Sequence, residues 1–523
     1  MTWVPKIVTV LREGYGLADL RSDALAGLTV AIVALPLAMA LAIASGVAPE
    51  KGLITAVVAG FLISALGGSR LQIGGPTGAF VVVVASVIAT HGYGGLLLAT
   101  LMAGALLLVA ALARFGDWIR YIPDPVVTGF TAGIAVIIAT SQVGDAFGLS
   151  LASSPPAFIE KVQALWSARD SASLPTLALT AVSLGALVAL PRLAPRLPAF
   201  LIVVVVSAAA VFLLRLPVET IGARFGTIAA TIPAPDLAGL PWGTMRELVP
   251  AAFTIAFLAG IESLLSAKVA DSMTGRRHRS NAELMAQGWA NIASALFGGL
   301  PATGAIARTA TNVRAGGRSP VAGMMHAGFL LAFWLLLAPL LRHVPLAALA
   351  AVLFVVAWRM AERHKVVALT LRAPAGDRVM MLATFALTVF VDLTTAIAVG
   401  VTLAALRFVH RMAQSVSVSA ETAGGLAVLT VRGPLFFGVT GQLIEAFERL
   451  DGDVRSVVIR LSESPLVDAS GIEVLANVIR RAKERGLEVR LVGLQPQPEK
   501  ALQQMGVLEG LAWESSKRQT APA

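Results

Sequence analysis

The sequence predicts a mostly helical polytopic membrane domain followed by a small α/β domain, and three observations lead to this fold class. Hydrophobic residues make up 56% of the 523 residues and charged residues only 14%, whereas a soluble protein carries about a quarter charged residues. Long uncharged stretches recur as far as Leu406. The tail from Gln414 onward returns to an ordinary charge density, with 12 Lys+Arg and 13 Asp+Glu. We therefore divide the chain into residues 1–414 and 415–523.

The membrane part is expected to hold 14 segments, some of them incomplete helices. A membrane-spanning helix needs about 20 mostly apolar residues, and twelve uncharged stretches lie between Ala24 and Leu406. The stretch 71–113 is long enough for two spans, which we divide near residues 91–95. Several later stretches are too short to cross a bilayer alone, so we expect broken or partnered helices there.

Lysine and arginine in the connecting loops indicate the orientation of these segments. Cytoplasmic loops carry an excess of these residues, and the richer clusters all fall inside when the N-terminus is placed inside. These clusters are Arg114/Arg120, Arg192/Arg196, Arg276/Arg277/Arg279, Arg314/Arg318, Arg359/Arg363/Lys365 and Arg407/Arg411. We therefore expect a multi-pass protein of the bacterial inner membrane, with its N-terminus and its tail in the cytoplasm.

Charge and composition exclude several classes of function. The net charge of +10 lies wholly before the tail, which indicates cytoplasmic loops, and no basic run is interleaved with aromatic residues as in a nucleic-acid surface. Cysteine is absent, which excludes disulfides. His91, His326 and His343 are scattered without the spacing of metal ligands. We expect no nucleic-acid partner, no metal and no cofactor.

An internal repeat occurs at the two most unusual segments. Residues 75–80 read GPTGAF and residues 301–306 read PATGAI, so Thr-Gly-Ala recurs at an offset of 226 residues. The same offset carries the first predicted span onto the eighth, which gives repeats of about 24–215 and 250–411. Seven spans in each repeat, an odd number, mean that the second repeat is inverted relative to the first. Inverted repeats with helices broken by Gly or Pro mark the substrate site of many secondary transporters.

The two repeated motifs predict a small anion pocket. Each motif is read as an extended piece, residues 71–74 or 297–300, followed by a half-helix that starts near Thr77 or Thr303. The free N–H groups of a helix N-terminus carry about half a positive charge, so two such ends facing each other can bind an anion. The alternative is that Gly and Pro only allow close helix packing. The candidate binding residues are Thr77, Gly78, Ala79, Thr303, Gly304, Ala305 and Ile306.

Two charged residues inside the apolar stretches complete the candidate site. Glu262 lies in the middle of residues 253–268, and a carboxylate at that depth is costly and a functional candidate. Burial favours its protonated form, so Glu262 could couple transport to a proton; the alternative is a structural pair. Arg308, five residues past Thr303, would add positive field or extend to the inner surface. We read Lys268 as interfacial and Asp392 as a helix-turn residue, and we expect no catalytic residue and no enzyme.

The tail has the alternating pattern of a small α/β domain. Strands are expected at residues 426–431, 457–461 and 489–492, and amphipathic helices at 442–450, 472–484 and 498–505. Asp468, Ala469 and Ser470 precede the middle helix, where Asp or Ser caps free N–H groups. Ser470 is also a candidate phosphorylation site.

These segments together resemble the sulfate permease (SulP) family, the bacterial relatives of solute carrier family 26, over nearly the whole chain. The shared motifs are residues 34–40 ALPLAMA, 72–80 QIGGPTGAF, 260–267 GIESLLSA and 303–314 TGAIARTATNVR. The tail, with residues 433–437 GPLFF and 468–471 DASG, is similar to the STAS domain that ends these transporters. Taken together, the motif sequences are most similar to those of the family branch that contains C4-dicarboxylate transporters.

The resemblance implies a core domain and a gate domain that work by an elevator-like motion, as a homodimer embedded in the lipid bilayer. It implies an anion between the third and tenth segments, at Thr77, Gly78 and residues 303–306, with the eighth-segment acid at Glu262 and the tenth-segment basic residue at Arg308. Sodium–bicarbonate symporters of the family carry Asp where this chain has Glu262, which favours a proton over sodium. Ala469 departs from the Asp-Ser-Ser-Gly of anti-sigma antagonists, which weakens phosphorylation of Ser470.

The expected function is a proton-coupled anion symporter or exchanger, with a C4-dicarboxylate preferred over sulfate or bicarbonate. Two alternatives stay open. One is a membrane-anchored anion sensor that signals through a cytoplasmic protein bound to its STAS domain. The other is a uracil-type nucleobase transporter of the same architecture, which the STAS tail and Arg308 disfavour.

Overall fold

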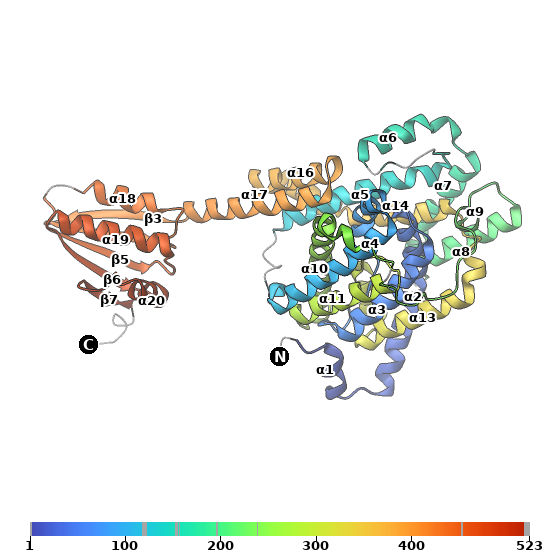
Figure 1. The fold of residues 1–523 in the computed structure, drawn as a ribbon, viewed down its shortest axis with the longest axis horizontal. Coiled ribbons are helices and arrows are strands. Elements are labelled where there is room, and N and C mark those ends of the chain that lie inside the picture. The colour runs from blue at the N-terminus through green and yellow to red at the C-terminus, as the bar shows by residue number, and fades with distance from the viewer. Residues whose placement is uncertain are drawn as a thin grey trace. The chain divides into compact units, whose positions relative to one another are not determined.

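The computed structural model describes residues 3–117, 123–151, 155, 157–194, 197–237, 239–450 and 453–516 (Figure 1). Arg120 and Arg196 of the predicted inner clusters lie outside these ranges. The chain divides into two compact units, Met1–Val401 and Thr402–Ala523. The predicted boundary at residue 414 is the C-terminal end of a helix that crosses this division, and the exact domain limits stay a prediction.

The first repeat consists of helices interrupted by one very short strand. Its elements, with the flanking helices, are α1 (Lys6–Glu13), α2 (Leu17–Ala44), α3 (Pro49–Leu66), β1 (Gly74–Gly75), the 3-10 helix η1 (Gly78–Phe80), α4 (Val81–Leu112), α5 (Asp124–Phe147), α6 (Phe158–Ser167), α7 (Leu174–Leu193), α8 (Ala199–Leu214) and α9 (Ile221–Phe225). Gly92 breaks α4 with φ 68° and ψ −176°. This break confirms the division into two spans predicted near residues 91–95.

The second repeat follows the same order of elements. It consists of α10 (Met245–Thr274), α11 (Ser280–Leu296), β2 (Thr303–Gly304), α12 (Ile306–Arg314), α13 (Pro320–Leu341), α14 (Leu346–Met360), α15 (Arg363–Arg372), α16 (Ala375–Phe390) and α17 (Leu393–Gln414). In the described part of the chain, eight helices are long and apolar enough to cross a membrane. The shorter helices α8, α11, α12, α14 and α16 supply the incomplete segments that the sequence predicts.

The two repeats interlock rather than lie side by side. Helices α2, α3 and α4 pack against α10, α11 and α13, so that segments far apart in the sequence, blue and green to yellow in Figure 1, are neighbours. A second group packs α5 against α14 and α16, and α7 against α8 and α14. These groups are the core and gate domains of the predicted fold class. The repeats meet again where β1 pairs with β2 in antiparallel register, Gly74 opposite Gly304 and Gly75 opposite Thr303.

The predicted start of the broken helix in the second repeat is wrong by two residues. Thr77 directly precedes η1, as expected, but Thr303 lies in β2 and the residue that precedes α12 is Ala305. Thr303 is held in extended backbone because it pairs with Gly75 and its hydroxyl donates to the Ala259 carbonyl at 2.7 Å. The extended piece is therefore Thr303–Gly304, and not residues 297–300, where the chain turns after α11.

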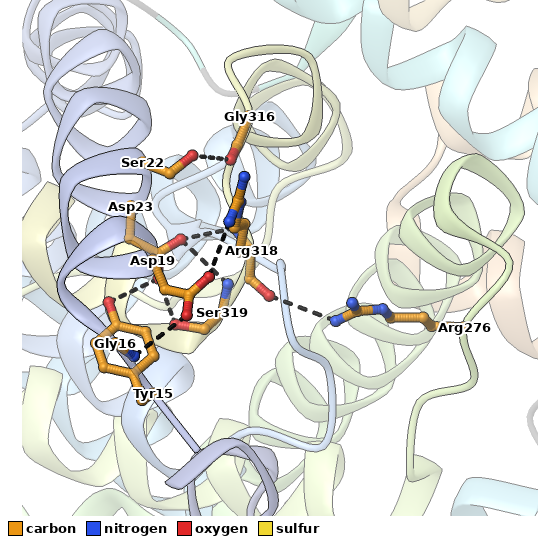
Figure 2. Close-up of polar contacts among 9 residues, drawn as sticks. All are labelled: Tyr15, Gly16, Asp19, Ser22, Asp23, Arg276, Gly316, Arg318 and Ser319. Carbon is orange, nitrogen blue, oxygen red and sulfur yellow. Dashed lines mark hydrogen bonds and ion pairs between the residues drawn. The ribbon is translucent and has the colours of Figure 1, made fainter. Parts of the chain in front are cut away.

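A polar cluster ties the start of α2 to the start of α13 (Figure 2). Asp23 is fully buried, and its carboxylate accepts hydrogen bonds from the Arg318 and Ser319 backbone N–H groups at 2.6 and 3.1 Å. The Ser319 and Tyr15 hydroxyls donate to the same carboxylate at 2.5 and 2.9 Å. Burial, and then the bond to Asp23, raise the pKa of the Tyr15 hydroxyl, so it stays a donor at physiological pH. Ser319 is the N-cap of α13, its Oγ accepting from the Val321 N–H at 3.1 Å, and Asp23, from a helix of the other repeat, holds this capping residue in place.

The second unit contains a five-stranded mixed sheet. Its elements are β3 (Ser417–Ala423), β4 (Leu426–Arg432), α18 (Thr440–Glu448), β5 (Ser456–Glu463), α19 (Ala469–Glu484), β6 (Glu488–Leu494), α20 (Pro496–Gln504) and β7 (Ala512–Ser515). The strand order is β3-β4-β5-β6-β7, with only the β3–β4 pair antiparallel. The three predicted strands and three predicted helices are confirmed. The edge strands β3 and β7 were missed because β3 is largely polar and exposed and β7 is short.

Candidate functional site

Two short helices, η1 and α12, begin just after the paired strands β1 and β2. η1 follows Thr77 and α12 follows Ala305; both residues have extended backbone, and neither side chain caps its helix. The first N–H groups of a helix have no partner within the helix and carry a partial positive charge. Two uncapped helix starts therefore lie on either side of a two-residue strand pair, which is the arrangement that the anion pocket requires.

Thr77 uses its hydroxyl on a different partner. Its Oγ1 donates to Oε2 of Glu262 at 2.8 Å, which explains why it does not cap η1. Glu262 lies in α10 and is half-buried. A single hydrogen bond thus joins the broken helix of the first repeat to the acidic helix of the second, and the donor remains able to bond Glu262 in either protonation state.

Arg308 places a positive charge beside the first half-helix. Its side chain is only 2% exposed, and Nη2 donates to the Pro76 carbonyl at 3.0 Å. Among the residues that the structure describes, its Nε and Nη1 atoms have no hydrogen-bond partner. The alternative of a side chain extended to the inner surface does not fit this burial. Guanidinium N–H groups bind anionic acceptors strongly, so the Nε and Nη1 groups of Arg308 are suitable donors to a bound anion.

The gate domain closes directly on η1. A Cβ placed on Gly78 would lie 3.1 Å from Cδ1 of Ile138 in α5 and 3.4 Å from Sδ of Met360 in α14. The half-helix belongs to the core group of helices, whereas α5 and α14 belong to the gate group. The candidate site therefore lies at the boundary between the two groups.

The remaining predicted residues lie in or beside the β1–β2 strand pair. Thr303 and Gly304 form β2, and the Ala305 N–H donates to the Ile73 carbonyl at 2.8 Å. Ala79 and Ile306 lie in the first turns of η1 and α12. The structure thus brings Thr77, Glu262 and Arg308 together with both helix starts, while direct contact of each predicted residue with an anion stays a prediction.

A buried polar network behind Glu262 was missed by the sequence reasoning. Ser263 accepts hydrogen bonds from Gln72 at 2.7 Å and Gln287 at 2.8 Å, and its hydroxyl donates to Oε1 of Glu283 at 3.0 Å. Oε2 of Glu283 accepts from the Gly68 and Ser69 N–H groups at 2.9 and 3.1 Å. Glu283 stands at the edge of an uncharged stretch, so it was read as the end of a span. The network holds α10, α11 and the loop before β1 in one position.

The other charged residues singled out from the sequence lie elsewhere. Lys268 is exposed, and Asp392 accepts from the Thr395 N–H at 2.8 Å at the start of α17, as its predicted turn role requires. His343 packs edge-on against Phe212, whereas His326 is fully buried. In the described ranges, no group of three or more His, Asp or Glu side chains could hold a metal ion.

The predicted cap in the tail is confirmed. Oδ1 of Asp468 accepts from the Gly471 N–H at 2.8 Å, and Oδ2 accepts from the Phe437 N–H at 3.1 Å. Ser470 follows in the first turn of α19 and is half-buried. Its phosphorylation stays a prediction.

The fold defines a polytopic membrane protein of the transporter type, in which two inverted repeats each contribute a broken helix. Residues 20–384 match the sulfate permease family and residues 417–520 match the STAS domain. The chain therefore belongs to the sulfate permease family and is an anion transporter with a C-terminal STAS domain.

Known proteins similar to the chain agree with this assignment. The "Putative sulfate transporter YvdB" of Bacillus subtilis is 40% identical and covers 95% of both chains. The bicarbonate transporter BicA of Picosynechococcus is 29% identical over 93% of this chain and 91% of its own. The membrane domain of a cyanobacterial BicA superposes with a TM-score of 0.66 at 31% identity, covering 73% of this chain and 98% of its own. Murine Slc26a9, inward-facing, shares the fold with a TM-score of 0.88 at 20% identity, covering 97% and 91%.

Proposed function

We propose that the chain is a proton-coupled dianion transporter that moves a C4-dicarboxylate across the bacterial inner membrane by an elevator-like motion. The observation that carries this proposal is the grouping of Arg308 and two uncapped helix starts around the Thr77–Glu262 hydrogen bond. One guanidinium and two helix ends amount to about two positive charges. That charge balances a dianion when Glu262 is protonated, which links binding of the substrate to binding of a proton.

Sulfate is the second candidate substrate, because it is also a dianion and YvdB is named for it. Bicarbonate, which BicA is named for, carries a single negative charge and would leave the site balanced with Glu262 ionised. The charge of the site therefore distinguishes a dianion moved with a proton from bicarbonate moved without one.

The elevator motion is supported by the division of the helices. The site belongs to the core group, and Ile138 and Met360 of the gate group close on it. Movement of the core along the gate would uncover the helix starts on each side in turn. We further propose that two copies form a homodimer, and that the N-terminus and the STAS domain, with a cytoplasmic protein as its partner, face the cytoplasm, as the arginine clusters indicate.

Uptake into proteoliposomes tests the proposal. Labelled fumarate, sulfate and bicarbonate are supplied with and without an inward proton gradient, and with and without a sodium gradient. We expect fumarate accumulation that follows the proton gradient and ignores sodium. Sodium-driven bicarbonate uptake that is indifferent to pH would overturn it, and so would tight anion binding without any flux, which indicates a sensor.

A further inference from the structure

An open apolar groove of about 920 Å³ runs along the gate domain between α5, α7 and α14. Its walls are almost wholly aliphatic and aromatic, with Leu177, Leu184 and Val188 from α7 and Phe354 and Trp358 from α14. Its volume lies within the usual range for small-molecule sites. These helices are part of the membrane domain, so the groove is bordered by lipid rather than water.

The groove carries charge at one end only. Among its lining residues the charged ones are Arg192, in the last turn of α7, and Arg359, in the last turn of α14. Both side chains are exposed. Neither has a carboxylate within ion-pair distance among the described residues, and Arg359 instead lies 5.6 Å over the ring of Phe200. The two arginines belong to clusters that the sequence assigns to the cytoplasmic side.

The length of the groove matches one leaflet of a bilayer. From Thr180 to Arg192, α7 rises about 18 Å at 1.5 Å per residue, and half of the hydrocarbon core is about 15 Å. Thr180 offers no free donor, because its hydroxyl bonds the Ala146 carbonyl at 2.8 Å. Trp358, 63% exposed, lies at the charged end, where aromatic residues occupy the membrane interface.

We propose that this groove binds one acyl chain of an anionic phospholipid of the inner leaflet, with its phosphate held between Arg192 and Arg359. Arginine binds phosphate oxygens through strong charge-assisted hydrogen bonds, and basic pockets on the cytoplasmic side of membrane helices recognise anionic headgroups. A second copy of the chain would fill the apolar walls but would bring two further copies of these arginines. The alternative role of the arginines, to complement the helix dipoles and extend to the surface, predicts no preference for one lipid.

Quenching of Trp358 by brominated acyl chains tests the proposal. The full chain is reconstituted in vesicles that contain either brominated phosphatidylglycerol or brominated phosphatidylcholine, each over the same series of low mole fractions. The difference between the wild type and Trp358→Phe isolates the Trp358 signal. We expect phosphatidylglycerol to quench Trp358 at about tenfold lower mole fraction than phosphatidylcholine, because two basic residues contribute to its binding.

Two double variants with the same change in charge show whether the arginines cause the preference. Arg192→Gln with Arg359→Gln should abolish it, whereas Arg372→Gln with Arg378→Gln, exposed arginines outside the groove, should retain it. Equal quenching by both lipids in the wild type would overturn the proposal without any variant. Absence of quenching by either lipid would also overturn it, because the groove is then covered by protein.

Discussion

The Thr77 hydroxyl donates a hydrogen bond to the Glu262 carboxylate over 2.8 Å. Thr77 precedes the broken helix of the first repeat and Glu262 lies in the first helix of the second, so this contact joins the proposed anion site to the proposed proton site. Arg308 from the second broken helix reaches the Pro76 carbonyl next to Thr77. The proposed coupling of anion binding to protonation of Glu262 therefore acts through adjacent groups.

Replacement of Arg308 should weaken anion binding. Arg308→Ala removes the two unpaired donors and the buried charge, and hydrogen bonds to charged groups are worth about 1.5–3 kcal/mol, so we expect about a tenfold or greater rise in Kd for labelled fumarate. The control is Arg314→Ala, an exposed arginine in the same helix. An unchanged Kd in Arg308→Ala would show that the anion binds elsewhere.

The β1–β2 strand pair should tolerate no side chain at Gly304. A Cβ there would collide with the Gln72 amide, which is itself held by Ser263. Gly304→Ala should lower the thermal unfolding temperature in detergent and abolish transport, whereas Gly328→Ala in α13, where a Cβ meets open space, should do neither. Addition of Gln72→Ala to Gly304→Ala should restore part of the lost stability. If Gly304→Ala behaves like Gly328→Ala, the close approach of β2 to Gln72 is wrong.

The buried hydrogen bonds by which Asp23 holds Ser319, the N-cap of α13, should stabilise the protein more than the ion pair beside them. Asp23→Ala leaves buried N–H and hydroxyl donors unpaired and should lower the free energy of unfolding by about 3 kcal/mol. Asp19→Ala removes a partly exposed ion pair with Arg318 at 3.0 Å, which water screens, and should lower the free energy of unfolding much less. Thermal unfolding of both variants in the same detergent measures the difference. Equal losses would contradict this role of Asp23.

The Asp468 cap should stabilise the first turn of α19. Asp468→Ala removes an N-cap, typically worth about 1 kcal/mol, and frees the Gly471 and Phe437 N–H groups. Hydrogen exchange of the full chain should therefore accelerate in the peptides that contain these residues. Glu473→Ala, an exposed change in the same helix, is the control. Unchanged exchange in Asp468→Ala would mean that the turn is held by its packing alone.

The sequence predicted the segments and the break points because both have local causes. Apolar length determines which segments can span a membrane, and the breaks fall at Gly92 and at the two repeated Gly/Pro motifs. The start of α12 was misplaced because Thr303 is held extended by Gly75 and Ala259, which lie far away in the sequence. The shared Thr-Gly-Ala motif alone aligned Thr77 with Thr303. In the structure, the residue directly before the broken helix is Thr77 in the first repeat and Ala305 in the second.

The site was predicted in part for the same reason. Glu262 and Arg308 stand out as single charges in apolar segments, so their residue type alone was enough to identify them as candidates for the site. Glu283 and Ser263 could not be found in this way, because Glu283 lies at the edge of an apolar stretch and serine is common in membrane helices. Their roles depend on Gln72 and Gln287, which approach only in the folded protein.

Proton-driven accumulation of fumarate by Glu262→Gln shows whether this carboxylate couples the anion to a proton. The glutamine keeps an acceptor for the Thr77 hydroxyl but binds no proton. In proteoliposomes, the variant should still exchange labelled for unlabelled fumarate across the membrane, while the wild type alone should accumulate fumarate under an inward proton gradient. Accumulation by Glu262→Gln equal to that of the wild type, at the same gradient, would contradict the coupling of anion and proton at this site.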